Sequence, residues 1–141
     1  MMNRYLLDTN ILVYIISGED YKIQRDILAV ISDAYNICEV SSVSMIEVSQ
    51  LLRKAKIKPR RGWEKENVLE LLTNNLNIRI LPFTERHVNT LLKLDAESGH
   101  NDPDDFAIVS HAITDRHTLV SSDEKFKYYT RQGLRFLYNK R

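Results

Sequence analysis

Short apolar runs alternate with longer amphipathic segments along the chain, and this alternation limits the fold more than any other feature of the sequence. Strands are expected at Tyr5-Leu6-Leu7, Ile37 to Val40, Ile78 to Leu81, Thr118 to Ser121 and Leu134 to Tyr138. Strands that alternate with helices are typical of βα units around a parallel sheet. We therefore predict an α/β fold, namely a three-layer α/β/α sandwich with a central, mainly parallel sheet.

The longer segments are expected to form helices, and several of them follow residues that commonly cap a helix. The expected helices run to Ile16 from a cap at Thr9 or Asn10, over 22–33, from Val43 to Ala55 behind a cap at Ser41 or Ser42, over 64–73, from Thr84 to about Ala96, and from Pro103 to Thr114. The segment from Ile11 to Ile16 is apolar throughout, so periodicity alone does not exclude a strand there.

The size and composition are those of an ordinary globular protein. At 141 residues the chain is expected to form one domain, residues 1–141. Its 43% hydrophobic and 28% charged residues argue against disorder, and a net charge of +1 demands no nucleic-acid or membrane partner. Cys38 is the only cysteine, so no internal disulfide can form. We see neither a signal-peptide pattern nor an apolar stretch of membrane length, and expect a cytoplasmic protein.

Four carboxylates stand where such a fold would normally place apolar side chains. Asp8 and Asp123 directly follow strand-like runs, while Glu47 and Asp105 lie on the apolar faces of helix-like segments. Ligands in α/β sandwiches collect at the carboxyl ends of the strands. Carboxylates that converge there repel one another by roughly 4 kcal/mol per pair at 4 Å, unless a cation or a proton intervenes. This arrangement predicts a metal-dependent enzyme.

Each acid also has a simpler interpretation. Asp8 and Asp123 could be helix caps, and Glu47 could lie at the edge of its apolar stripe and reach water. In Asp102-Pro103-Asp104-Asp105, capping and the helix dipole account for Asp102 and Asp104. They account poorly for Asp105, which shares a face with apolar residues and is expected to point inward.

Four segments together resemble PIN-domain nucleases, and most closely the VapC-type ribonuclease toxins of bacterial toxin–antitoxin modules. They are Leu6-Leu7-Asp8-Thr9-Asn10, Ser41-Ser42-Val43-Ser44-Met45-Ile46-Glu47-Val48, His100-Asn101-Asp102-Pro103-Asp104-Asp105-Phe106-Ala107-Ile108-Val109 and Leu119-Val120-Ser121-Ser122-Asp123-Glu124-Lys125-Phe126. Many of these toxins have an aromatic residue followed by Asp-Arg where this chain has Asp104-Asp105-Phe106. The arginine that could contact a phosphate is therefore missing here, while the acidic framework is intact.

The resemblance implies an endoribonuclease that hydrolyses RNA with Mg²⁺ or Mn²⁺, a cognate antitoxin as partner, and a homodimer. It also implies site residues at the positions that match the family: Asp8, Glu47, Asp105 and Asp123 in the acidic metal site, and Asn10, Asp102 and Ser121 in support of it. Hard divalent ions prefer carboxylate oxygens, which suits this set. Asp8 and Asp105 are expected to be the core ligands, Asp123 to complete the site directly or through water, and Glu47 to be a ligand or to orient the attacking water.

The remaining polar residues give weaker indications. The histidines have no zinc-ligand spacing, and we interpret all of them as surface or packing residues: His87, His100, His111 and His117. A basic run precedes Trp63 and consists of Arg53, Lys54, Lys56, Lys58, Arg60 and Arg61. It could hold an RNA backbone, or it could be a solvated helix end, and the resemblance adds a role in a groove for the antitoxin.

Two other functions remain open from the sequence. The first is a catalytically silent PIN-like module that only binds other proteins, although all four acids are present. The second is a phosphohydrolase with Asp8 as phosphoryl acceptor. Enzymes of the haloacid-dehalogenase kind usually have a second Asp two residues later, where this chain has Asn10.

Overall fold

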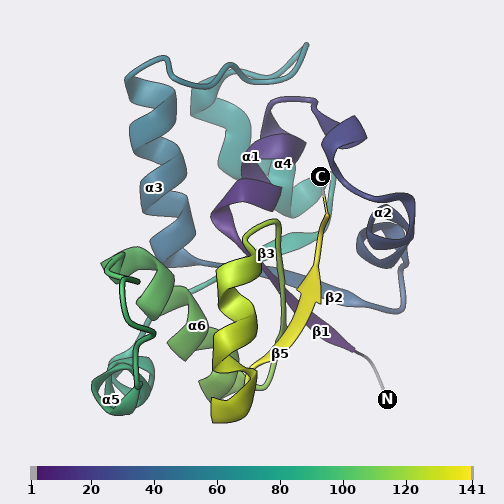
Figure 1. Cartoon of the computed structure of the whole chain (residues 1–141). Coiled ribbons are helices and arrows are strands. Elements are labelled where there is room, and N and C mark those ends of the chain that lie inside the picture. The colour runs from purple at the N-terminus through teal and green to yellow at the C-terminus, as the bar shows by residue number, and fades with distance from the viewer. Residues whose placement is uncertain (1–2, 141) are drawn as a thin grey trace.

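Five parallel strands form one sheet at the centre of the protein (Figure 1). The structure is a computed structural model that describes residues 3–140. The strands are β1 (Arg4–Leu7), β2 (Ile37–Ser41), β3 (Ile78–Leu81), β4 (Thr118–Ser121) and β5 (Arg135–Tyr138). They lie in the order β3-β2-β1-β4-β5, and every pair of neighbours is parallel. The predicted α/β fold with a central parallel sheet is therefore confirmed.

Helices cover both faces of the sheet. They are α1 (Thr9–Ile16), α2 (Arg25–Ser32), α3 (Ser42–Arg53), α4 (Val68–Asn74), α5 (Glu85–Lys93) and α6 (Pro103–Asp115), together with 3₁₀ helices η1 (Asp20–Lys22), η2 (Lys65–Asn67) and η3 (Glu124–Gln132). Adjacent strand residues point to opposite faces, so Leu7 packs with α1, α2 and α4, whereas Leu6 packs with α6 and η3. Helix α5 packs on the outside of α6, and α3 contacts both α1 and α6.

The sheet order places the carboxyl ends of β1 and β4 beside each other. The chain runs outward from β1 through β2 to β3, and then returns to the other side of β1 to form β4 and β5. The direction of strand addition thus reverses at β1, and such a switch point leaves a crevice between the two loops that follow the strands. The loop after β1 begins with Asp8, and the loop after β4 leads to Asp123.

Several element boundaries differ from the predicted ones. Helix α1 is capped by Asp8, whose side chain accepts from the Thr9 N–H, and not by Thr9 or Asn10. Helix α2 begins at Arg25 because the backbone before it is held by Asn139, which accepts from the Gln24 N–H and donates to the carbonyl of Lys22. These bonds join two segments that are distant in sequence, which local patterns do not reveal.

Other boundaries are closer to expectation. Ser41 caps α3 and Asp102 caps α6, as predicted. The expected helix over 64–73 is divided into η2 and α4, and α5 ends at Lys93, three residues before the predicted end. In residues 3–140, no helix is both long enough and apolar enough to cross a membrane.

Candidate active site

An open cavity of about 380 Å³ lies at the carboxyl ends of β1 and β4, bordered by α1, α3 and α6. Its lining includes five acidic residues: Asp8, Glu47, Asp102, Asp105 and Asp123. Asn10 also lines it. The structure thus brings together all four carboxylates that the sequence singled out, although they lie up to 115 residues apart in the chain.

Asp8 is the most buried of these acids, at 4% exposed. Its Oδ1 accepts from the Thr9 N–H at 2.8 Å, which caps α1. Its Oδ2 accepts from Ser121 Oγ at 2.7 Å and from Asn10 Nδ2 at 3.3 Å. Capping and a place in the cavity are therefore compatible, because each carboxylate oxygen has lone pairs for more than one partner.

Asn10 and Ser121 connect the loops that follow β1 and β4. Asn10 Nδ2 lies 3.2 Å from Ser121 Oγ, and Asn10 Oδ1 accepts from the Ser122 N–H. Ser121 Oγ in turn accepts from the Asp123 N–H at 3.0 Å. The Ser121 hydroxyl thus contacts Asp8 and also fixes the backbone of Asp123. These bonds determine the position of the Asp8 carboxylate relative to that of Asp123.

Glu47 reaches the cavity from α3 and is held there by Thr9. The Thr9 hydroxyl lies 2.8 Å from Glu47 Oε1 and 3.0 Å from Ser44 Oγ. The Glu47 side chain is half-buried and therefore does not extend freely into water. Sequence reasoning considered Thr9 only as a cap. The position of Thr9 directly after Asp8 could have indicated this role, because a residue next to Asp8 lies at the same crevice.

Asp105 projects from the first turn of α6 and is fixed by a buried histidine. His100 Nε2 lies 3.0 Å from Asp105 Oδ2, and His100 Nδ1 lies 2.7 Å from the hydroxyl of Tyr129. The neighbouring Asp104 is not among the cavity-lining residues, and Asp102 accepts from its N–H as the helix cap. The helix geometry thus directs Asp105 inward and leaves Asp104 outside the cavity.

Burial and like charges raise the pKa of Asp8, Glu47 and Asp105. Burial raises the pKa of Asp8 to about 7, with a smaller contribution from the charges of Asp105 and Glu47, against the opposing hydrogen bonds from Ser121 and Thr9. Burial also raises the pKa of Glu47 to about 6, and raises the pKa of Asp105 despite the His100 contact. Among the described residues that line the cavity there is no lysine or arginine. A divalent cation would supply the missing positive charge.

All four histidines are buried, so of the two predicted alternatives, surface or packing, the structure agrees with packing. A ring nitrogen of each lies near a carboxylate oxygen: His87 at 3.0 Å from Asp115, His100 at 3.0 Å from Asp105, His111 at 3.2 Å from Asp115 and His117 at 2.8 Å from Glu39. For His87, His100 and His117 the sequence spacing indicated no grouping, because each partner lies outside the element or loop of the histidine, whereas His111 and Asp115 lie one turn apart in α6.

The basic run that begins at the last residue of α3 divides into two parts. Arg53, Lys54, Lys56, Lys58 and Arg61 are exposed. Arg60 is different, since its side chain donates to the carbonyl of Ile15, approaches Asp20 and lies over the ring of Trp63. Arg60 therefore fixes the loop between α3 and η2 to the end of α1, and the other five cations remain available to a polyanion.

Comparison with known proteins agrees with this geometry. A family model for the PIN domain matches residues 5–132. The fold is similar to a chain of VapBC2 from Rickettsia felis bound to a promoter DNA fragment, with 23% identity, a TM-score of 0.74, and 97% of this chain and 99% of that chain covered. It is also similar to a chain of VapBC-1 from nontypeable Haemophilus influenzae, with 20% identity, a TM-score of 0.67, and 96% and 97% covered. A search of curated proteins finds no match. Because the family model spans nearly the whole described fold, including every acid of the cavity, the chain belongs to the PIN domain family.

Proposed function

We propose that this protein is a metal-dependent endoribonuclease that hydrolyses RNA phosphodiester bonds, and that it is the toxin of a toxin–antitoxin pair. The observation that carries the proposal is the convergence of Asp8, Glu47, Asp105 and Asp123 on one cavity whose lining holds no basic side chain to balance them. Membership of the PIN domain family supports nuclease chemistry. The carboxylate oxygens fit Mg²⁺ or Mn²⁺, which prefer hard oxygen ligands.

The residues of the cavity have different proposed roles in catalysis. When bound, one or two such ions would lower the pKa of a water molecule and neutralise charge on the scissile phosphate and its leaving oxygen. Asp8 and Asp105 are the core ligands, and Asp123 completes the site directly or through water. Glu47, with a pKa raised to about 6 chiefly by burial, is a further ligand or orients the attacking water. Asn10 and Ser121 hold Asp8, and Asp102 supports the site as the cap of α6.

RNA is proposed as the substrate, with the exposed cations after α3 as its contact. Helix α3 carries Glu47 and Leu51 into the cavity wall and ends at Arg53, so the basic segment continues from an element that borders the site. Phosphate contacts of this kind give affinity without sequence preference. Weakened binding of RNA at raised salt is therefore expected, in proportion to the number of cations engaged.

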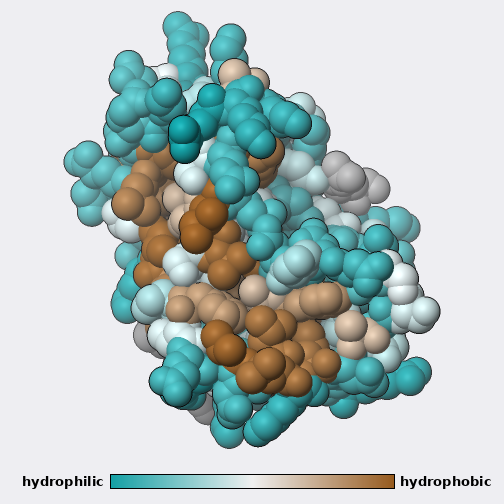
Figure 2. Space-filling model, turned by 90° about the vertical axis from the view of Figure 1, so that its left-hand side faces the viewer, coloured by the Kyte–Doolittle hydropathy of each residue, from teal (hydrophilic) through white to brown (hydrophobic). Residues whose placement is uncertain are grey.

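An antitoxin partner and a homodimer are proposed from the exposed apolar surface. Ile46 on α3 is 60% exposed and Leu92 on α5 is 80% exposed. Figure 2 shows apolar side chains gathered on the face that α3 and α5 border. Contiguous apolar surface commonly marks protein interfaces. The two similar solved structures described above are of VapBC, one of them bound to DNA, which supports a partner protein. We place such a pair in the cytoplasm.

Asp105→Ala should remove RNA cleavage, whereas Asp104→Ala should retain most of it. The two residues are adjacent in α6, but only Asp105 lines the cavity. Loss of a core ligand should lower kcat/KM by at least about 100-fold, which corresponds to about 2.7 kcal/mol. The measurement is cleavage of a labelled RNA panel in Mn²⁺ by both variants, after circular dichroism shows that both are folded. Equal losses would mean that Asp104 is also required.

His100→Gln should lower activity by about 10- to 100-fold and weaken Mn²⁺ binding, because outer partners orient metal ligands. His100 joins Asp105 to the Tyr129 hydroxyl, and in the variant these contacts would be lengthened or lost. Tyr129→Phe is the matched control, since it removes the contacts of the Tyr129 hydroxyl with His100 and the Glu97 N–H but keeps the contact between His100 and Asp105, and it should have a smaller effect. Unchanged Mn²⁺ affinity in a folded His100→Gln variant would show that this contact does not position Asp105.

The proposed function is tested by incubating a mixed RNA panel with the purified protein in EDTA, Mg²⁺ or Mn²⁺. Cleavage in either metal and none in EDTA is the expected result, together with loss of cleavage on addition of the cognate antitoxin. Cleavage that persists in EDTA would contradict a metal-dependent mechanism. Saturable metal binding without cleavage of any RNA, including total RNA from the host, would favour a protein-interaction module.

A further inference from the structure

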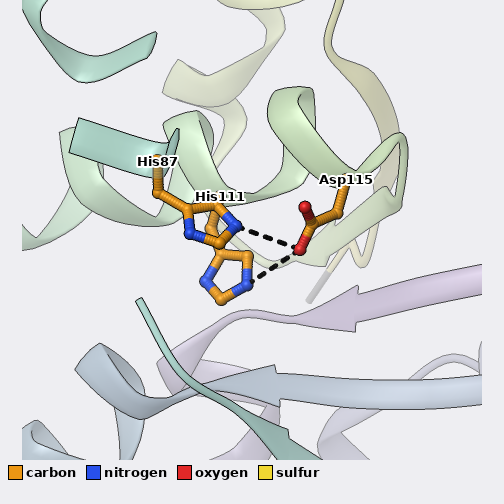
Figure 3. A group of neighbouring side chains, drawn as sticks. All are labelled: His87, His111 and Asp115. Carbon is orange, nitrogen blue, oxygen red and sulfur yellow. Dashed lines mark hydrogen bonds and ion pairs between the residues drawn. The ribbon is translucent and has the colours of Figure 1, made fainter. Parts of the chain in front are cut away.

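A second group of potential metal ligands lies between α5 and α6, away from the acidic cavity. Figure 3 shows the rings of His87 and His111 directed at the carboxylate of Asp115. His87 Nε2 lies 3.0 Å and His111 Nε2 lies 3.2 Å from Asp115 Oδ2, and one ligand atom from each residue falls within 4.8 Å of the others. Ligands about 2.0–2.1 Å from a tetrahedral ion are themselves about 3.3 Å apart, so the two distances to Asp115 are close to those of a zinc site.

The Nε2 atom of His111, which points toward Asp115, has no hydrogen bond. His111 is fully buried, and its Nε2 makes no hydrogen bond despite its short distance to Asp115 Oδ2. Buried polar atoms nearly always have a partner, so a buried ring nitrogen without one needs an explanation. Burial lowers the pKa of His111 to about 4, so the ring is neutral at pH 7. A neutral imidazole nitrogen is a metal ligand.

The other nitrogen of each ring is held by a hydroxyl group. His111 Nδ1 lies 2.9 Å from Ser41 Oγ, and His87 Nδ1 lies 2.8 Å from Thr84 Oγ1. The Thr84 N–H also donates to His87 Nδ1, which places the proton of the metal-free ring on Nε2. Metal binding at Nε2 would place the proton on Nδ1 with Thr84 Oγ1 as its acceptor, and the N–H of the exposed Thr84 would exchange its bond to the ring for one to water. Such orienting contacts are a regular feature of histidine ligands.

The group is open to solvent on one side and lies apart from the acidic site. A cavity of about 550 Å³ is lined by His87 and Asp115 together with Thr84, Glu85, Arg4 and Arg86, and the Arg4 guanidinium is paired with Glu39. It shares no lining residue with the cavity that holds Asp8. Arg86 approaches Asp115 only at 3.9 Å and is 75% exposed, so it can move into water when a cation enters.

From this arrangement we propose that His87, His111 and Asp115 bind a late first-row transition ion of the Zn²⁺ class. Two imidazoles and one carboxylate select Zn²⁺ over Mg²⁺, because borderline ions favour nitrogen and hard ions favour oxygen. The ion would link the first turn of α5 to the end of α6 and stabilise their packing. The proposal is independent of the nuclease function, since it uses none of the residues assigned to that site.

The experiment uses the full chain with the acidic site silenced by Asp8→Asn and Glu47→Gln, so that ions bound there do not interfere. Co²⁺ is titrated into the metal-free protein as a spectroscopic probe, followed by competition with Zn²⁺. Visible d–d absorption that saturates at one equivalent and disappears with Zn²⁺ is the expected result. Zn²⁺ should also raise the Tm by about 5 °C or more at saturating concentration. Absence of saturable Co²⁺ binding would overturn the proposal.

Variants of the ligands locate the binding. His111→Gln and Asp115→Asn, each in the silenced background, should weaken Co²⁺ binding by more than about 100-fold, which is beyond the loss seen for outer partners. His117→Gln is the matched control, because His117 is equally buried and adjacent but bonds to Glu39 instead. Its Co²⁺ affinity should be unchanged. If His111→Gln does not fold, the partly exposed Asp115 supplies the test alone. Undiminished binding by folded Asp115→Asn would also contradict the site.

Discussion

Asp8→Asn should abolish RNA cleavage and, in the absence of metal, make the protein more stable than the wild type. The carboxylate is nearly fully buried beside other acids, and burial raises its pKa to about 7. The charge that the reaction needs is therefore one that the fold tolerates poorly without a cation. Cleavage should fall by at least about 100-fold, equivalent to about 2.7 kcal/mol of transition-state stabilisation.

The gain in stability should depend on pH. Because the folded-state pKa of Asp8 is above the usual 3.8, the metal-free folded protein retains a proton that the unfolded chain releases. The stabilisation of the wild-type fold by this retained proton is fully present below pH 3.8 and is lost as the pH rises toward about 7. At about 1.4 kcal/mol per pH unit, the free energy of unfolding that the wild type loses in this way is at most about 4 kcal/mol. An amide at position 8 loses part of the hydrogen bonding, so a gain of about 1–3 kcal/mol is expected at pH 7.5.

Urea unfolding of both proteins in EDTA, at pH 4 and at pH 7.5, measures this effect. The variant should gain stability only at the higher pH, and added Mn²⁺ should stabilise the wild type but not the variant. A variant that is less stable at both pH values would show that Asp8 acts chiefly as the cap of α1. That result would remove the electrostatic basis for a cation at this position.

Glu39→Ala should have the largest effect on folding, about 2–4 kcal/mol of destabilisation. Glu39 lies on β2, and its side chain is only 3% exposed. Its Oε1 accepts from Arg4 Nε and Nη2 at 3.1 and 2.8 Å, and lies 2.8 Å from His117 Nε2. Burial lowers the pKa of His117, so the ring is neutral at pH 7 and donates its proton to Glu39. Removal of one member of a buried charged group leaves the others without partners.

The control for this prediction is Arg4→Ala. Its side chain is 40% exposed and can be hydrated, so its loss should cost less than the loss of Glu39. Thermal and urea unfolding compare the two variants, with Glu39→Gln as an intermediate that keeps the acceptor oxygen but not the charge. If Glu39→Ala lowered the free energy of unfolding by less than Arg4→Ala, the buried carboxylate would not be important for the sheet.

Sequence patterns were sufficient for the sheet and for the acids that follow its strands. Strand ends of a parallel sheet meet at one edge, so Asp8 and Asp123 could be placed together without coordinates. The helix period was sufficient to place Asp105 as well, because it predicts that Asp105 faces the inside of α6 and Asp104 does not. In both cases the position of the side chain is fixed by a local, repeating geometry.

The bonds between distant elements could not be predicted in this way. The Glu39 partners come from β1 and from the residues before β4, and His100 reaches Asp105 only because the chain before α6 folds back on Tyr129. The start of α2 was misplaced for the same reason, since Asn139 fixes the preceding backbone from the far end of the chain. Such contacts depend on tertiary structure and leave no periodic signal.

The central claim is that the acidic cavity binds the divalent ion used for RNA hydrolysis, and anomalous diffraction tests it most directly. A crystal of the wild-type protein grown with Mn²⁺ should show an anomalous peak in contact with Asp8 and Asp105, and the same peak should be absent from Asp8→Asn. A cavity that contains only water at saturating Mn²⁺, in a protein that still cleaves RNA, would contradict the account.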